Sequence, residues 1–238
     1  MSDPAGLATL VRAARERARE LEEFALPQRC PGCGAPAPAA RLLCDGCWER
    51  VPALSFPVCA RCLARGAEPV GCRRHPGSRV WPALVYDERA ALLVHALKFG
   101  QRPGLAAELG ARLARAVPAT PAFDLVTAVP LHAARRRERG YDQARLLAET
   151  VADRLGVPAL PDALVRERAT PAQTGLDPAQ RRRNLAGAFR VTEPRRLRGR
   201  RILIVDDVIT TGATLEACLA ALSAAGAAAT GAALAWAQ

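Results

Sequence analysis

Residues 202 to 214 read Ile-Leu-Ile-Val-Asp-Asp-Val-Ile-Thr-Thr-Gly-Ala-Thr, and this stretch decides the fold class. The run Ile202 to Val205 is continuously apolar and mostly β-branched, which is typical of a strand covered on both faces of a parallel sheet. Two acids follow the run, then a loop rich in threonine, and then a helical stretch over residues 215–225. A strand, a small loop and a helix in this order indicate an α/β fold.

The loop after the strand has the composition of an anion site. Backbone N–H groups and the positive end of the helix dipole would face the ligand, and Gly212 would let the backbone approach it. Asp206 and Asp207 would repel a bare phosphate, so they need sugar hydroxyls or a bound Mg²⁺ as partners. A ligand with a terminal phosphate, vicinal hydroxyls and a magnesium-bound group satisfies all of these features. The alternative is an acidic turn without a ligand, which is costly because the two acids would then lack partners.

Length and composition limit the class of protein. A chain of 238 residues can hold one α/β domain of ordinary size and a small appendage. We find no apolar run of 18 residues and no basic-then-apolar leader, so we expect a cytoplasmic protein that does not insert into a membrane. The net charge of +11 suggests binding to a polyanion such as nucleic acid, although 33 of the 34 basic residues are arginine, which also fits compositional drift. Against this bias the single lysine, Lys98, stands out as a compact ammonium.

Seven of the eight cysteines lie between residues 30 and 72, in pairs with regular spacing. Two CxxC pairs predict a four-cysteine zinc site, and a third CxxC pair with a later CxxH predicts a site of three cysteines and one histidine. Each set supplies four ligands, so we expect two structural sites with no open position for water. Disulfides are the alternative, and the lack of a secretory leader argues against them. The first set is Cys30, Cys33, Cys44 and Cys47, and the second is Cys59, Cys62, Cys72 and His75. The eighth cysteine, Cys218, lies among alanines and is predicted to be a small core residue.

The order of patterns predicts three regions: an N-terminal helix over residues 1–25, a double zinc ribbon over 26–80 and an α/β domain over 81–238. Strands alternate with helices in the last region, which predicts a parallel sheet. The expected strands are 83–86, 124–129, 163–166, 188–191, 202–205 and 230–236, and the expected helices are 88–99, 105–117, 142–155 and 215–225.

Two arginine-rich segments and one helix end are further candidates for ligand contacts. Lys98 lies in the last turn of the helix predicted over 88–99, two residues before Gly100. Gly100 suits a helix C-cap, or else Lys98 and the neighbouring loop meet pyrophosphate. The run 132–143 follows a predicted parallel strand, where arginines could bind phosphate or form a mobile lid, or else remain a solvated loop. The segment 173–189 is predicted to be an exposed connection that precedes a strand.

Residues 202–214 closely resemble the PRPP (phosphoribosyl pyrophosphate) signature of type I phosphoribosyltransferases. Together with CPGCG, CDGCW, LKFG, VPLH…RGYDQA and QTGL…RRRNLAGAF, they resemble the ComF family of competence-associated proteins, from about residue 26 onward. The family combines an N-terminal zinc-binding region with a phosphoribosyltransferase-type domain. His75 departs from the family pattern, because such ribbons often have cysteine there.

The resemblance implies roles for individual residues. Asp206 and Asp207 would hold the ribose hydroxyls, Lys98 and Gly100 would lie by the pyrophosphate, and Arg139 would belong to a flexible loop that extends to Gln143. The 5′-phosphate would be bound by Thr210, Thr211, Gly212, Ala213 and Thr214.

The resemblance leaves two classes of function open. The first is a magnesium-dependent enzyme that transfers a ribosyl group from PRPP to an unknown acceptor, with Asp206, Asp207 and Lys98 as its catalytic residues. The second is a binding module for single-stranded DNA and a competence helicase, which keeps the PRPP site for sensing or structure. Both fit the link of the family to DNA uptake.

Overall fold

The computed structural model describes residues 29–37, 42–65, 72–99, 103–118, 123–131, 133–167 and 178–237. These residues belong to two compact units, divided between Arg50 and Val51. The predicted helix over 1–25, Gly100 and the Gln173–Leu176 motif lie outside the described residues. Residues 51–65 and 72–80, which the sequence analysis assigns to the zinc region, belong to the same unit as the sheet.

The first unit is built around its four cysteines. Its described helix, α2 (Asp45–Glu49), begins directly after Cys44. Among the described residues of this unit, the buried apolar side chains are those of Cys30, Ala37, Leu43 and Cys47. A core this small cannot hold a fold without further support.

The second unit contains a five-stranded sheet with the order β1-β2-β7-β6-β3. Neighbouring strands are parallel except for β1, which pairs antiparallel with β2. Ile202 to Val205 are fully buried on β6, an interior strand of the sheet, as their apolar run predicts. The strands are β1 (Val58–Cys59), β2 (Arg79–Val85), β3 (Leu125–Ala128), β6 (Arg201–Ile209) and β7 (Ala228–Trp236).

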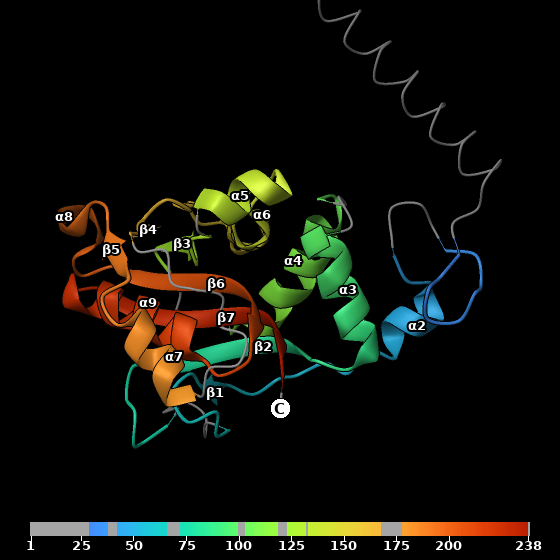
Figure 1. Cartoon of the computed structure of the whole chain (residues 1–238), viewed down its shortest axis with the longest axis horizontal. Coiled ribbons are helices and arrows are strands. Elements are labelled where there is room, and N and C mark those ends of the chain that lie inside the picture. The colour runs from blue at the N-terminus through green and yellow to red at the C-terminus, as the bar shows by residue number, and fades with distance from the viewer. Residues whose placement is uncertain are drawn as a thin grey trace, which may run out of the picture. The chain divides into compact units, whose positions relative to one another are not determined.

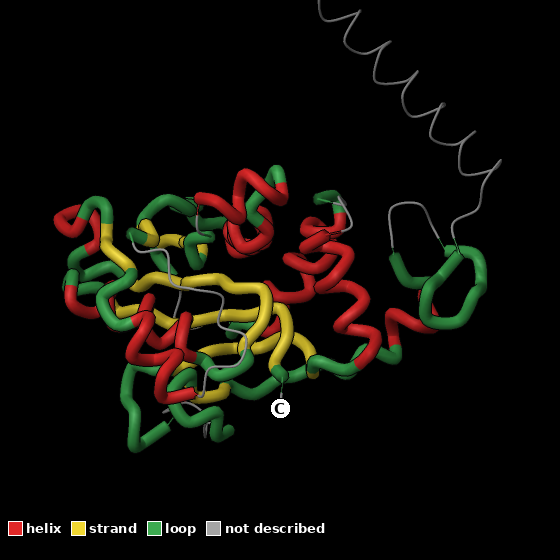
Figure 2. The backbone as a smooth tube through the Cα atoms, viewed as in Figure 1, coloured by secondary structure: helices red, strands yellow, loops and turns green. Residues whose placement is uncertain are grey.

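Helices cover the sheet on both sides. Figure 1 shows α4 and α6 on one side of β6 and β7, and α7 and α9 on the other. The strands form the centre of this unit in Figure 2, where they are drawn in yellow between red helices. Within the described part of the chain, no helix has both the length and the apolar character needed to cross a bilayer. The helices of this unit are α3 (Glu88–Phe99), α4 (Leu105–Ala116), α5 (Ala133–Arg139), α6 (Gln143–Leu155), α7 (Pro178–Leu185), α8 (Pro194–Leu197) and α9 (Ala213–Ala224).

The structure differs from the sequence prediction at several places, and three of them bear on the site. Strand β6 does not end at Val205 but continues to Ile209, because β7 pairs with it along its whole length. The strands β4 (Leu164–Arg166) and β5 (Phe189–Val191) do not join the parallel sheet and form a separate antiparallel pair. The two arginine-rich segments contain α5 and α7, where the sequence analysis predicts a loop and a connection. Strand β2 also begins at Arg79, four residues before the predicted start, and β1, α2 and α8 were not predicted.

Candidate functional site

The two acids on β6 meet a cation and an amide from other elements. Asp207 is buried, and its two carboxylate oxygens have different partners. The ammonium of Lys98, in the last turn of α3, lies 2.9 Å from Oδ1. The side-chain amide of Gln143, the first residue of α6, donates a hydrogen bond of 2.7 Å to Oδ2. The structure therefore brings together Lys98 and the acid pair, which the sequence analysis assigns to one site.

Asp206 is half-buried and carries a perturbed carboxyl group. Burial raises its pKa to about 7, and the neighbouring charge of Asp207 acts in the same direction. The backbone N–H of Asp207 donates a 2.8 Å hydrogen bond to Asp206 Oδ1, and this bond together with Lys98 limits the rise of the pKa. Once Asp206 is ionised, the two acids beside one ammonium carry excess negative charge, which suits a divalent cation or hydroxyl donors.

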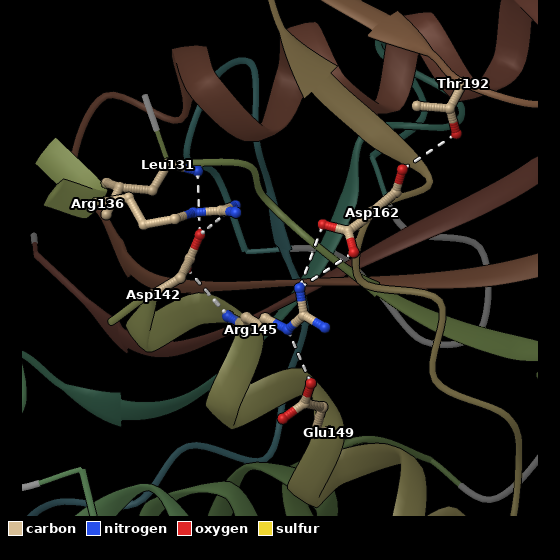
Figure 3. A network of polar contacts seen from close by, with 7 residues as sticks. All are labelled: Leu131, Arg136, Asp142, Arg145, Glu149, Asp162 and Thr192. Atoms are coloured by element: carbon tan, nitrogen blue, oxygen red, sulfur yellow. Dashed lines mark hydrogen bonds and ion pairs between the residues drawn. The ribbon is translucent and has the colours of Figure 1, made fainter. Parts of the chain in front are cut away.

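Asp142 determines where α6 begins and thereby places Gln143. Its Oδ1 accepts a hydrogen bond from Arg145 N at 3.2 Å, which caps the helix N-terminus. Its Oδ2 lies 3.4 Å from both Leu131 N and Arg136 Nη2. Figure 3 shows this carboxylate between the backbone after β3 and the start of α6, with Arg145 continuing the network to Glu149 and Asp162. Asp142 thus joins the segment after β3, helix α5 and helix α6 next to Gln143.

The end of α3 contacts the segment that the sequence analysis predicts to be a flexible loop. Tyr141 donates a 2.5 Å hydrogen bond to the carbonyl oxygen of Leu97, next to Lys98. Arg139, in the last turn of α5, places its guanidinium 4.7 Å from the ring centre of Phe99, on the other side of Lys98. Both contacts hold the 139–141 segment beside the lysine.

The loop after β6 leads into α9 through Gly212. Thr210 is exposed, whereas Thr211 and Thr214 are half-buried. Gly212 is the N-cap of α9 with φ of +71°, a backbone conformation that favours glycine. A Cβ at this position would lie 1.8 Å from the carbonyl oxygen of Ala60. The carbonyl group of Ala60, in the second cysteine region, therefore occupies the Cβ side of Gly212. The predicted contact of the Gly212 backbone with a phosphate stays a prediction.

The four ligand atoms of each predicted metal set gather within 4.8 Å of one another. In the first set, Cys33 Sγ and Cys44 Sγ are 3.5 Å apart. In the second, Cys62 Sγ and Cys72 Sγ are 3.7 Å apart, and His75 Nδ1 lies 3.5 Å from Cys59 Sγ. Zinc–sulfur bonds of about 2.3 Å in a tetrahedron put sulfurs about 3.8 Å apart, so both sets fit a structural zinc ion.

No disulfide joins any of the seven cysteines of the two sets or Cys218. Cys218 is a fully buried core residue on α9 and belongs to neither ligand set, as the sequence analysis predicts. Burial raises the pKa of its thiol well above the usual value, which is typical of a small apolar core residue.

Sequence reasoning misses two residues that shape this site. It includes Gln143 in the helix predicted over 142–155 and, through the resemblance, at the end of a flexible loop, but it assigns the residue no contact with Asp207. It assigns no role to Ala60, which lies against the loop after β6. Asp142 is a preferred N-cap residue and marks the start of the helix, but no local pattern indicates the contact between Gln143 and Asp207.

Comparisons with known proteins agree with this architecture. The phosphoribosyl transferase domain family matches residues 142–238, and the double zinc ribbon domain family matches residues 21–74. The DNA utilization protein YhgH of Salmonella typhi is 34% identical over 192 residues, which cover 78% of this chain and 74% of that protein. Competence protein F of Haemophilus influenzae is 32% identical over 190 residues, which cover 73% of this chain and 81% of that protein.

A solved structure of glutamine PRPP amidotransferase from B. subtilis, complexed with ADP and GMP, is similar with a TM-score of 0.40 and 21% identity. That similarity covers 59% of this chain and 30% of the other. Both relatives are more than 30% identical to this chain over most of their length, and the two domain families match in this order. Together these matches identify the family. The chain belongs to the ComF family of competence-associated proteins, with a double zinc ribbon followed by a phosphoribosyltransferase domain.

Proposed function

We propose that this protein binds Mg²⁺-PRPP at the end of β6 and transfers its ribosyl group to an acceptor. The observation that carries the proposal is the acid pair on β6, with the ammonium of Lys98 at 2.9 Å from Asp207 and a threonine-rich loop leading into α9. The match of residues 142–238 to phosphoribosyl transferase domains supports the same assignment.

The donor set fits each part of this ligand. Carboxylate oxygens suit ribose hydroxyls and a magnesium ion, and N–H groups at the start of a helix suit the 5′-phosphate. Gln143 supports the fit, because its buried Oε1 has no hydrogen-bond partner among the described residues and can accept one from a bound hydroxyl or water. The bound Mg²⁺ supplies charge neutralisation for the pyrophosphate leaving group.

In the proposed reaction, the bond between ribose C1 and the pyrophosphate oxygen breaks, and an acceptor atom forms the new bond to C1. Asp206 and Asp207 hold the ribose, and Thr210, Thr211, Gly212, Ala213 and Thr214 hold the 5′-phosphate. Lys98 leaves Asp207 to meet the departing pyrophosphate, and Arg139 adds a second cation from α5. These groups stabilise charge and position the ring, so they need no covalent chemistry of their own.

Pyrophosphate release from Mg²⁺-PRPP tests this proposal. Zinc-loaded protein is mixed with a panel of nucleobases, amines and single-stranded DNA, and PRPP affinity is measured by calorimetry in parallel. We expect acceptor-dependent release that is lost in Asp206→Asn/Asp207→Asn. Asp153→Asn, which removes an exposed carboxylate on α6, is the matched control and should retain the parent rate. Failure of PRPP to bind the parent protein would refute the proposal.

Binding to single-stranded DNA is a second candidate function, and the charge distribution favours it. Arg135, Arg136 and Arg137 form an exposed basic run on α5, on the same short helix as Arg139. The chain as a whole carries a net charge of +11. Basic side chains beside a nucleotide site suit a polyanionic ligand.

The salt dependence of DNA binding tests this second function. Arg135→Ala/Arg137→Ala removes two exposed charges but keeps Arg136, which contacts Asp142. If both arginines contact phosphates, the slope of log K against log salt should become shallower by about 1.4, at about 0.7 per single-strand contact. Arg195→Ala/Arg196→Ala on α8 removes the same charge from another exposed helix and serves as the control. Equal slopes for both variants would exclude a specific role for α5.

A further inference from the structure

The second cysteine set lies against the loop that we assign to the 5′-phosphate. Ala60, between the ligands Cys59 and Cys62, is fully buried. Its carbonyl group occupies the space where a side chain of Gly212 would be, with the oxygen 1.8 Å and the carbon 2.7 Å from a Cβ at that position. Backbone meets backbone here, so a shift of one segment forces a shift of the other.

A set of polar contacts joins the same two segments. Arg61 Nε lies 3.3 Å from Oε1 of Glu216, in the first turn of α9. Arg182 on α7 lies 3.4 Å from the other carboxylate oxygen of Glu216 and donates a 3.0 Å hydrogen bond to the carbonyl oxygen of Arg61. Glu216 N in turn donates to the carbonyl oxygen of Gly212 at 2.9 Å. Arg61 and Arg182 thus hold the first turn of α9 through the carboxylate of Glu216.

The segment around Cys59 packs into the core of the second unit, but its own regular secondary structure is short. Strand β1 has only two residues, paired with Val80 and Arg79 of β2. Leu63, directly after Cys62, has φ of +57°, a conformation unfavourable for a residue with a Cβ. The four ligand atoms, all within 4.8 Å of one another, would add a further constraint once they bind an ion.

We propose that zinc at the second site holds the loop 210–214 in its ligand-binding conformation, so that zinc binding and phosphate-ligand binding are thermodynamically linked. The second zinc site then belongs to the nucleotide site, with Ala60 and Arg61 as positioning residues. The ligand part of this inference rests on the proposed PRPP function, whereas the effect of zinc on the loop does not. Because coupling between sites is reciprocal, PRPP should also retain zinc at the second site.

Matched double variants of the full chain test the linkage. Cys62→Ser/Cys72→Ser removes one exposed and one half-buried ligand of the second site, and leaves the buried Cys59 in place. Cys33→Ser/Cys44→Ser removes an equivalent pair from the first site, in the other unit. We expect faster amide hydrogen exchange over residues 210–216 in the second-site variant alone. We also expect its PRPP affinity to fall roughly 5- to 150-fold, the usual range of coupling between sites.

Zinc release from the parent protein tests the linkage where the second-site variant does not fold. A chromophoric chelator should remove two zinc ions at different rates, and saturating PRPP should slow one of them. Arg61→Ala, which keeps all four ligands, should reduce that protection. Equal exchange over 210–216 in the two cysteine variants, or zinc release unaffected by bound PRPP, would overturn the inference. If the parent protein does not bind PRPP, the proposed function is refuted. Hydrogen exchange over residues 210–216 would still decide the effect of zinc on the loop.

Discussion

Asp206 is the residue whose chemistry is most altered by its surroundings. An unfolded aspartate releases its proton near pH 3.8, whereas burial keeps Asp206 protonated up to about pH 7. Between these values the folded state binds more protons than the unfolded state, so the free energy of unfolding falls as pH rises from about 4 to 7. Above about pH 7 this destabilisation is complete.

Asp206→Asn removes this titration. We expect the melting temperature of the parent protein to fall relative to that of the variant between about pH 4 and 7, because only the parent must ionise a carboxyl group whose pKa is raised in the folded state. Calorimetry of both proteins across this range checks the prediction. Melting curves that stay parallel at every pH would show that Asp206 ionises at its ordinary value.

Gly212 is constrained by its backbone and by its neighbour at once. Gly212→Ala should destabilise the protein through its positive φ and through the contact with the Ala60 carbonyl group, which cannot rotate away. Gly156→Ala is the control, since Gly156 has a similar φ of +68° and open space around it. We expect about 1–2 kcal/mol of destabilisation for the control and about 1–3 kcal/mol more for Gly212→Ala, measured by urea unfolding. Equal losses would exclude a tight contact with Ala60.

At this scale the sequence predicts residue types better than partners. The acids, the threonines and Lys98 stand out because their chemistry fits one ligand. The hydrogen bond from Gln143 to Asp207 spans 64 positions, and no local pattern indicates such a contact. The same holds for Ala60, an unremarkable residue whose carbonyl group decides why Gly212 must be glycine.

Helices α4 and α6 cross closely because Gly110 has no side chain. A Cβ on Gly110 would lie 2.6 Å from Cβ and 2.8 Å from Cγ2 of Thr150. Gly110→Ala should gain about 1 kcal/mol of helix propensity but lose about 1–3 kcal/mol through overpacking, for a net destabilisation. Gly104→Ala, at the start of the same helix with nothing near its Cβ position, should change stability by less than about 0.5 kcal/mol. Denaturant unfolding of both variants would contradict this packing if Gly110→Ala were the more stable protein.

The elements that the sequence predicts well are those with a clear apolar pattern. Helix α3 has the predicted bounds of Glu88 to Phe99, and α6 differs by one residue because Asp142 is its cap. Helices α5 and α7 are missed since their arginines hide any apolar period, although arginine, alanine and glutamine favour helices. The order of the strands depends on pairings between distant segments, which a strand pattern does not specify.

The whole molecule divides its metal sites between two units of very different size. The first unit has few buried apolar side chains among its described residues, and two of them are the metal ligands Cys30 and Cys47. Its folded state should therefore depend on zinc. The second unit contains the sheet and its core, and should survive without the first ion.

Zinc loss from the first site should unfold one unit alone. In Cys33→Ser/Cys44→Ser we expect rapid proteolytic cleavage before Arg50, while the main calorimetric transition of the sheet keeps its temperature. Limited proteolysis with mass spectrometry, beside calorimetry of the parent, checks both parts. A large drop in the main transition would show that the two units fold together.

Strand β7 lies between β2 and β6, although it is the last of the three to be synthesised. On the ribosome, β2 must therefore wait for its parallel neighbour while residues 86 to 227 are translated, on the order of ten seconds. During this interval one edge of the apolar strand β2 has no partner from the finished sheet. Nascent chains of this protein are thus expected to depend on chaperones until β7 emerges, and premature stop codons upstream of Ala228 should yield aggregates rather than a smaller folded domain.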